Sequence, residues 1–443
     1  MLSKDDFKVH SLGERPVSSP LKLSDTFGDG LANFIPDESF ILYQSEIIPG
    51  RRRIPDLMFE KAGPRRSIFF EPPKTRAALV TCGGLSPGLN GVIRSICLEL
   101  HYHYGVRDIL GIRYGFKGLN PANGYDPIPL TLDVVSNIHR FGGTFLGSSR
   151  GGEDVAVIAD TLYDLGIDIL FCIGGDGTLK GAHAINEELR KRNYRKAVIG
   201  IPKTIDNDIS YVDKTFGFDT AIGIACDVLT SAHSEALGAP NGIGLVKLMG
   251  RDSGFVAAYA ALASLEVNFV LIPEAPFDLE GKNGLFAHLR DRLEKRHHAV
   301  IVTAEGAGQE HMPAGEKKRD ASGNIKHQDI GVFLADRIRE FSSLNRLDWN
   351  LKYIDPSYYI RSVPANANDS IYCDSLARNA VHAGMAGKTD LVIGFWNGFS
   401  THVPIPLAVS TRKKIQPESD FWRTVCEATG QPISMKAVSG SSE

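Results

Sequence analysis

Residues 167–178 have the sequence IDILFCIGGDGT, and this stretch decides the fold class. A short apolar run rich in β-branched residues ends at Ile173 and is followed at once by a glycine-rich turn and a polar, helix-like segment. An apolar run of this length, bounded by glycine, is typical of a strand that is covered on both faces of its sheet. The stretch therefore predicts a buried parallel strand, a tight turn and a helix.

The same pattern recurs along the chain from Arg76 onward. Short apolar runs bounded by glycine or proline alternate with helical patterns, and they lie at 77–82, 197–201, 244–249, 269–272, 300–303 and 391–395. This alternation predicts an α/β fold with two doubly wound, mainly parallel-sheet domains and an N-terminal extension. Such sheets bind ligands in the loops beyond the carboxyl ends of their strands.

Four segments are expected along the chain. Residues 1–73 are rich in proline, serine and charge and show no clear periodicity, so they predict an N-terminal extension that is partly ordered over the body or another subunit, with a disordered tail as the alternative. Residues 74–217 form a first domain, completed by about 362–410. Residues 218–361 form a second domain, and 411–443 form a C-terminal extension.

Composition excludes several classes of protein. The 443 residues include 49 basic and 52 acidic side chains, a net charge of -3, which gives no indication of a nucleic-acid surface. Six scattered cysteines without CxxC spacing are typical of a reducing compartment. No apolar run is long enough for a membrane span, and the first residues lack the apolar core of a secretory signal, so we expect a cytoplasmic protein without membrane contact.

Two glycine-rich loops follow predicted strands and open predicted helices. The first is Cys82–Asn90 and the second is Gly174–Thr178. Glycines let a backbone come close to a ligand, and the N–H groups at a helix start favour phosphate. By itself, the first loop is equally compatible with a tight turn that binds nothing. In the second loop Asp176 is the candidate ligand for Mg²⁺, which usually takes one or two protein carboxylates.

A third loop, Pro202–Asp208, places two carboxylates around one amide just past an apolar strand. Phosphoryl transfer needs positioning, charge neutralisation and a base that receives the acceptor hydroxyl's proton. Either Asp206 or Asp208 could be that base, while the other is hydrogen-bonded or near the metal. The alternative is an Asx turn, which does not account for the adjacent Lys203.

Several single residues follow other predicted strands and could hold anionic groups. Arg150 is placed at a strand-like end, where its planar guanidinium could reach a phosphate. The other candidates are Arg251 at a helix start, Glu305, Lys352, Tyr358 and Arg361. Taken singly, each is better explained as a surface residue.

Taken together, these motifs resemble those of phosphofructokinases. Gly83–Asn90, Gly174–Thr178, Pro202–Asp208, Met249–Arg251, Glu305 and Tyr358–Arg361 occur in that family's order, and the resemblance covers about residues 76–410. The motifs are most similar to the long, group II form of plants, trypanosomes and some bacteria. The resemblance implies transfer of the γ-phosphoryl group of ATP to the 1-hydroxyl of fructose 6-phosphate, with Mg²⁺. It also implies an allosteric enzyme that assembles as a homotetramer or homodimer.

The resemblance also assigns roles to matching residues. Asp206 would be the base and Asp176 the Mg²⁺ ligand. ATP would be bound by Gly84, Arg150, Gly151, Gly175, Asp176, Gly177 and Thr178. The sugar phosphate would be bound by Thr204, Ile205, Asp206, Met249, Gly250, Arg251, Glu305, Lys352, Tyr358, Tyr359, Ile360 and Arg361.

Two residues bear on the choice of donor. Pyrophosphate-dependent relatives have Asp where this chain has Gly177, and that carboxylate would crowd and repel the α-phosphate of ATP. Lys203, in contrast, is typical of the pyrophosphate enzymes. Gly177 bears directly on whether ATP fits, so we expect ATP. The alternatives are a pyrophosphate-dependent enzyme, a NAD or lipid kinase that shares only the second glycine loop, and a noncatalytic regulatory subunit that binds sugar phosphate.

Overall fold

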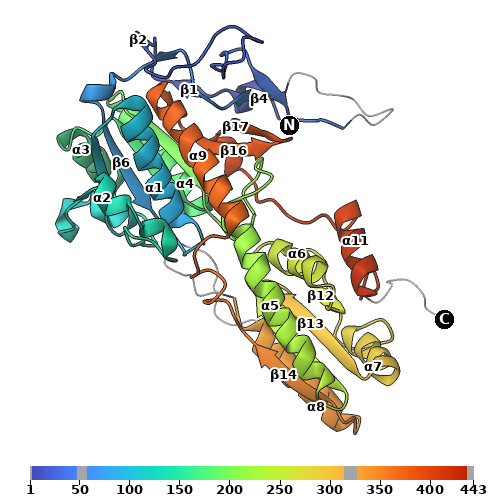
Figure 1. Ribbon diagram of the computed structural model, residues 1–443. Helices are drawn as coiled ribbons and strands as arrows, with labels where there is room; N and C mark the ends of the chain where they lie inside the picture. The colour runs from blue at the N-terminus through green and yellow to red at the C-terminus, as the bar shows by residue number, and fades with distance from the viewer. Residues whose placement is uncertain (1, 47–56, 314–326, 437–443) are drawn as a thin grey trace. The chain divides into compact units, whose positions relative to one another are not determined.

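The computed structural model describes residues 2–46, 57–313 and 327–436, and the chain divides into two compact units, each with its own central sheet (Figure 1). Unit 1 comprises Met1–Thr204, Ile209–Gly217 and Ser362–Arg412. Unit 2 comprises Ile205–Asp208, Phe218–Arg361 and Lys413–Glu443. The chain therefore passes between the units several times.

The centre of the unit 1 sheet is parallel. Its strands, in spatial order, are β7 (Asp108–Ile112), β6 (Arg76–Thr81), β9 (Ile169–Gly174), β10 (Ala197–Pro202) and β16 (Leu391–Trp396). From β6 the chain first moves to β7 on one side and then returns to β9 on the other. This reversal is a topological switch point, where doubly wound sheets bind ligands.

Successive side chains of each strand point to opposite faces of this sheet, and helices cover both faces. Ala77 and Leu79 of β6 share a buried cluster with α1 (Leu89–Leu98) and α9 (Ala367–Met385). Ala78 and Val80 share another with α3 (Val155–Asp164) and α4 (Asp176–Lys191). Helices α1 and α9 pack against each other (Figure 1).

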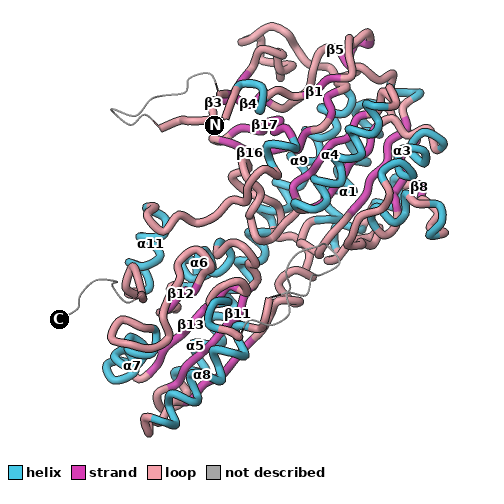
Figure 2. The backbone as a smooth tube through the Cα atoms, turned by 180° about the vertical axis from the view of Figure 1, so that it is seen from behind, coloured by secondary structure: helices cyan, strands magenta, loops and turns pink. Residues whose placement is uncertain are grey.

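The edges of this sheet are antiparallel, which the sequence did not predict. Strand β17 (Phe399–Pro404) pairs with β16, and β4 (Met58–Lys61) and β3 (Phe40–Leu42) continue the sheet outward (Figure 2). On the opposite edge β8 (Ile128–Pro129) pairs with β7. Two further pairs join β1 (His10–Ser11) to β15 (Lys388–Thr389) and β2 (Val17–Ser18) to β5 (Ser67–Ile68). The N-terminal segment therefore extends the sheet of unit 1.

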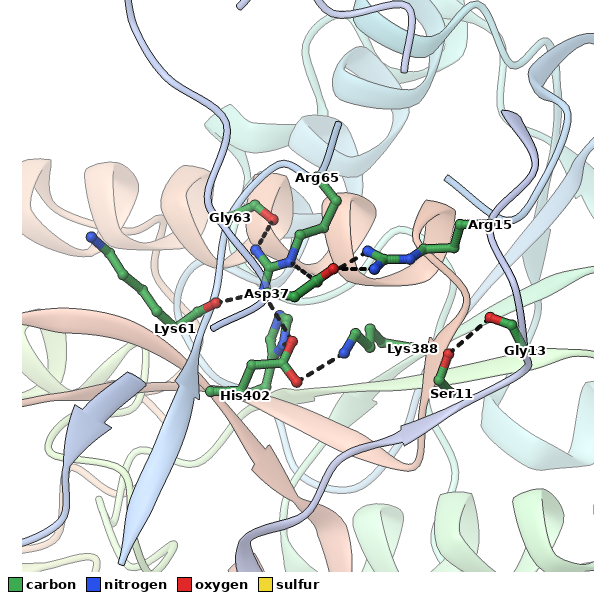
Figure 3. A network of polar contacts seen from close by, with 10 residues as sticks. Ser11, Gly13, Arg15, Asp37, Lys61, Gly63, Arg65, Lys388 and His402 are labelled. Carbon is green, nitrogen blue, oxygen red and sulfur yellow. Dashed lines mark hydrogen bonds and ion pairs between the residues drawn. The ribbon is translucent and has the colours of Figure 1, made fainter. Parts of the chain in front are cut away.

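A buried ionic network fixes this N-terminal segment (Figure 3). Arg65 is almost fully buried, and its guanidinium lies 2.9 Å from Glu60 and 3.1 Å from Asp37. Glu60 also lies 2.9 Å from Lys388 and 3.1 Å from His402. Burial alone would raise the pKa of Glu60, but its hydrogen bonds to His402 and Lys388 and their charges outweigh burial and hold the pKa well below its usual range. Glu60 is therefore charged at neutral pH, whereas burial lowers the pKa of His402 and favours its neutral form.

Unit 2 has a smaller, fully parallel sheet. Its strands, in spatial order, are β12 (Phe269–Leu271), β13 (His298–Ala304), β11 (Gly242–Leu248) and β14 (Asn350–Ile354). One face packs on α5 (Phe218–Leu237), α6 (Phe255–Ser264) and α11 (Asp420–Thr429), and the other on α7 (Leu285–Arg296) and α8 (Ile330–Leu344).

Short elements complete the connections. They are α2 (Leu132–Val135), α10 (Ile405–Ala408), the π-helix η3 (Glu99–Tyr104) and the 3-10 turns η1 (Lys4–Phe7), η2 (Pro72–Lys74), η4 (Gly115–Leu119), η5 (Pro121–Asn123), η6 (Ile138–Arg140) and η7 (Gln309–His311). Among the described residues, no helix combines the length and apolar character needed to cross a bilayer.

The predicted fold class is confirmed. Each apolar run named from the sequence coincides with a strand, within a few residues at its ends, and these strands are parallel to their central neighbours. The differences lie at the sheet edges, where antiparallel strands were not expected.

Candidate functional site

In unit 1 three strands end at the same level. The register pairs Thr81 with Ile173, and Pro202 with Gly174. Backbone bonds continue past the strand ends, from the Cys82 N–H to the Ile173 carbonyl (3.1 Å) and from the Lys203 N–H to the Gly174 carbonyl (2.9 Å). The first and second glycine loops and the start of the third loop therefore lie side by side at the carboxyl edge of the sheet.

The segment that carries Arg150 joins this group. The Gly83 N–H donates to the Ser149 carbonyl at 2.9 Å, and the Ser148 hydroxyl donates to the Gly83 carbonyl at 2.6 Å. Arg150 and Gly151 follow directly and are exposed. The predicted strand-like end at Arg150 is wrong, because residues 141–154 form turns and irregular backbone that bond to the first loop in place of a sheet neighbour.

The second loop forms the start of a 16-residue helix. Gly175 is the N-cap of α4, Asp176 is its first residue, and Thr178 is buried. Gly177 is exposed, and a Cβ added there would meet no atom within 4 Å. Free N–H groups and the helix dipole at such an end attract anions, so this end of α4 is suited to phosphate.

The carboxylate of Asp176 lies close to two cations. Its Oδ2 is 2.9 Å from Lys180 Nζ and 3.6 Å from an Arg412 guanidinium nitrogen, and its side chain is 19% exposed. Mg²⁺ in proteins usually takes one or two carboxylates, with water or phosphate oxygens as the remaining ligands, and Asp176 offers one accessible carboxylate at a turn suited to phosphate. The residues present therefore fit the metal that the sequence predicted.

Lys203 is buried beneath the first loop. Its Nζ donates to the Gly84 carbonyl at 2.6 Å, and a Cβ on Gly83 would lie 3.2 Å from the same nitrogen. The ammonium group is thereby held against the glycine turn, where it also contributes positive charge to the strand ends.

In unit 2 three of the predicted residues pack together. Ile205, Met249 and Ile360 belong to one small apolar cluster that includes Ala221 and Ile224 of α5. The Ser253 hydroxyl donates to the Asp206 carbonyl at 3.1 Å. The backbone of Asp206 is therefore held by the packing of its neighbour Ile205 and by the hydrogen bond from Ser253 in the loop that follows β11.

The ends of β11 and β13 form a second set of adjacent loops. The Glu305 N–H donates to the Leu248 carbonyl at 3.0 Å, and the Gly306 N–H donates to the Gly250 carbonyl at 2.9 Å. Gly250 has φ of +129°, a conformation that glycine adopts far more readily than other residues. Arg251 and Glu305 are thus held near each other by the backbone.

Beyond β14, Arg361 lies with its guanidinium carbon 4.8 Å from the centre of the Tyr358 ring. Tyr358 and Tyr359 are exposed. Lys352 differs from the other candidates, because it lies within β14 opposite Gly244, two residues before the strand ends, and is exposed.

One charged group in unit 2 was missed from the sequence. Lys247 in β11 is buried and lies 2.7 Å from Asp329 and 2.8 Å from Asp355. Burial would lower the pKa of Lys247, but hydrogen bonds to Asp329 and Asp355 outweigh burial and raise the pKa above its ordinary value. A lysine inside the otherwise apolar run 242–249 was the available signal.

Comparisons with known proteins agree on one family. Residues 76–384 match the family model described as phosphofructokinase. The chain is 50% identical over 440 residues to the ATP-dependent 6-phosphofructokinase of Borreliella burgdorferi, covering 97% of this chain and 98% of that one. It is 48% identical over 436 residues to ATP-dependent 6-phosphofructokinase 1 of Arabidopsis thaliana, covering 98% and 90%.

A solved structure supports the fold. The pyrophosphate-dependent phosphofructokinase of Marinobacter aquaeolei is similar with a TM-score of 0.65 and 19% identity, covering 81% of this chain and 91% of that one.

The backbone contact at Gly306 generates a stability prediction. A Cβ on Gly306 would lie 1.9 Å from the Arg251 carbonyl oxygen, so Gly306→Ala must displace the loop after β11. We expect a loss of about 1–3 kcal/mol in the free energy of unfolding. Gly177→Ala is the matched control, because its Cβ enters open space. Denaturant titration of both variants measures the difference, and equal stabilities would contradict the tight contact.

Proposed function

Because the chain belongs to the phosphofructokinase family, we propose that the two sets of loops divide that family's reaction between them. The chain is a kinase that phosphorylates fructose 6-phosphate with ATP, giving fructose 1,6-bisphosphate and ADP. The observation that carries this activity is the 50% identity to an ATP-dependent 6-phosphofructokinase over almost the full length of both chains.

The loops of unit 1 bind ATP in this proposal. Its supports are the position of the loops after β6 and β9, on either side of the switch point, and the helix start at Gly175. The residues assigned to ATP are Gly84, Arg150, Gly151, Gly175, Asp176, Gly177 and Thr178. Asp176 would hold Mg²⁺, which when bound neutralises charge on the phosphates.

Fructose 6-phosphate is assigned to Thr204 at the end of unit 1 and to residues of unit 2. The shared cluster of Ile205, Met249 and Ile360 supports this assignment, because it fixes the backbone of three of the loops concerned. The remaining assigned residues are Asp206, Gly250, Arg251, Glu305, Lys352, Tyr358, Tyr359 and Arg361. Arg251 and Arg361 supply positive charge for the anionic end of the sugar phosphate.

Asp206 is proposed as the general base. It would accept the proton of the 1-hydroxyl as the oxygen attacks the γ-phosphorus. Its half-buried position on a loop anchored by Ser253 and Ile205 supports this role, because general base catalysis requires a fixed hydrogen-bond geometry. Loss of Asp206 or Asp176 would have favoured a noncatalytic regulatory role, but both residues are present in this chain.

Donor choice is assigned to Gly177, with Lys203 as a second determinant. The open space around Gly177 supports this proposal, because it leaves room for the part of ATP that pyrophosphate lacks. The Lys203 ammonium group donates a hydrogen bond to the Gly84 carbonyl, so Lys203 would act at the first glycine loop. Both ATP and pyrophosphate would bind at that loop.

Assembly and location are extrapolated from the family. We propose that copies of the chain form a homotetramer or homodimer and that the enzyme works in the cytoplasm, with allosteric control.

Replacing the proposed base tests the mechanism. We expect Asp206→Asn, which keeps size and removes proton acceptance, to lower kcat by about 10²–10⁴-fold while the KM for fructose 6-phosphate changes little. Steady-state kinetics with both substrates varied would show this. An unchanged kcat with a raised KM would make Asp206 a binding residue instead.

A charge placed at position 177 tests donor choice. Gly177→Asp introduces a carboxylate beside the phosphates of ATP, and like charges in contact cost several kcal/mol, so kcat/KM for ATP should fall by roughly 10²-fold or more. Any rate with pyrophosphate should fall much less. Gly177→Asn is the matched control, since it has the same size without the charge. Equal losses with both donors would contradict the assignment, whereas equal losses of ATP use in both variants would make the effect steric and not electrostatic.

A further inference from the structure

Five aromatic side chains connect the N-terminal segment to the loop that carries Asp206. They are Phe7, Tyr43 and Phe59 from the N-terminal segment, Tyr211 from the loop, and Trp396 at the end of β16. Ring centres are 5.8 Å apart for Tyr43 and Tyr211 and 4.8 Å for Phe7 and Phe59. The ring of Tyr211 contacts all four of the other rings.

The loop concerned is closed at its base. Lys203 and Phe216 form a bridge, and the Thr215 hydroxyl donates to the Thr204 carbonyl at 2.5 Å. Between such adjacent ends, a compact loop is held by what packs on its body and by the hydrogen bonds that it makes. Tyr211 lies in that body, five residues after Asp206 in the sequence.

The backbone of this loop is in a conformation that needs external support. Tyr211 has φ of +60°. A bulky residue such as tyrosine rarely adopts the left-handed region, and it persists there where surrounding contacts hold it. The contacts of Tyr211 include the four aromatic rings described above, three of them from the N-terminal segment.

Hydrogen bonds attach the loop and the N-terminal segment to the same turn between β16 and β17. The Asp213 N–H donates to the Phe395 carbonyl at 2.9 Å, and the Asn397 N–H donates to Asp213 Oδ2 at 3.0 Å. From the other side, Trp396 Nε1 donates to the Tyr43 carbonyl at 3.0 Å. The turn thus joins loop and extension into one assembly.

The loop is also connected to the proposed metal residue. Ile209 and Arg412 form an antiparallel bridge, and the Ser210 hydroxyl donates to the Thr411 carbonyl at 2.9 Å. The guanidinium of Arg412 then reaches Asp176 at 3.6 Å. A displacement of Tyr211 would therefore disturb the backbone on both sides of it.

We propose that the N-terminal segment positions the catalytic loop, through the contact of Phe7, Tyr43 and Phe59 with the ring of Tyr211. Tyr211 and Phe7 are positioning residues, since neither is assigned to substrate, and they act through the placement of Asp206. This inference rests on the assignment of Asp206 as the base in the proposed function.

The test compares Tyr211→Ala and Phe7→Ala with Tyr211→Phe in the full chain. Misplacing a catalytic group by about 1 Å costs up to 10²-fold, so kcat should fall about 10- to 100-fold in both alanine variants, with KM for both substrates nearly unchanged. Tyr211→Phe keeps the ring and should keep kcat. Tyr211→Leu replaces Tyr211→Ala if the latter fails to fold, and it should also lower kcat.

A matched control and a double variant sharpen the test. Tyr163 stacks on Tyr194 at 4.6 Å in another part of unit 1 and is 57% exposed, so Tyr163→Ala removes a ring without touching the loop and should keep kcat. If Phe7 acts through Tyr211, the double alanine variant should lose no more than the stronger single variant.

Four outcomes would overturn the inference. They are an alanine variant at Tyr211 or Phe7 that melts earlier but keeps kcat, an equal loss in Tyr163→Ala, losses that multiply in the double variant, and a loss accompanied by a change in molecular size. Asp206→Asn, assayed in parallel, separates the two proposals. If it keeps kcat the base assignment fails, whereas if it loses kcat while Tyr211→Ala does not, only the positioning role fails.

Discussion

The in-register pairing of β6, β9 and β10 is the constraint on which the rest of unit 1 depends. These strands are buried on both faces and end at one level, so the polar loops that follow them must emerge together. Backbone bonds extend this registry past the strands to Cys82 and Lys203. At positions 83, 84 and 175 no side chain would keep a phosphate away from the backbone.

Charged side chains near the loops are paired with side chains of opposite charge. Asp176 faces Lys180 and Arg412, and Lys247 faces Asp329 and Asp355. A buried charge without a partner is costly, so loss of Asp329 and Asp355 would leave the buried Lys247 without the acids that pair with it. Phosphoryl transfer demands little covalent chemistry from a protein, and what it does demand is this kind of prearranged charge and position.

The sequence predicted the strands and glycine loops because their signals are local. Residues 77–82 and 167–178 carry the apolar run, the turn and the helix start within a few positions of each other. The edge strands β3 and β4 carried no such signal. They are three or four residues long, and their stability depends on partners such as His402, which lies 342 residues after Glu60. Strand propensity depends strongly on such context.

The sequence predicted some site residues better than others, because only some of them carry a local signal. Residues inside motifs, such as Gly175–Thr178 and Asp206, lie at strand ends or helix starts as expected. Arg150 and Lys352 were placed less well, because a single cation has no periodicity that locates it in a loop or within a strand. Arg412 and Lys247 were missed altogether, because their importance arises from contacts with distant acids.

The most direct measurement of the roles of Asp206 and Asp176 is a structure of the enzyme with Mg²⁺, a non-hydrolysable ATP analogue and fructose 6-phosphate. We expect an Asp206 carboxylate oxygen to lie about 2.6–3.2 Å from the 1-hydroxyl oxygen, the range for direct proton transfer. We also expect Asp176 to hold the metal directly or through water. A different acid at the 1-hydroxyl, with Asp206 directed away from the sugar, would contradict the assignment of Asp206 as the base.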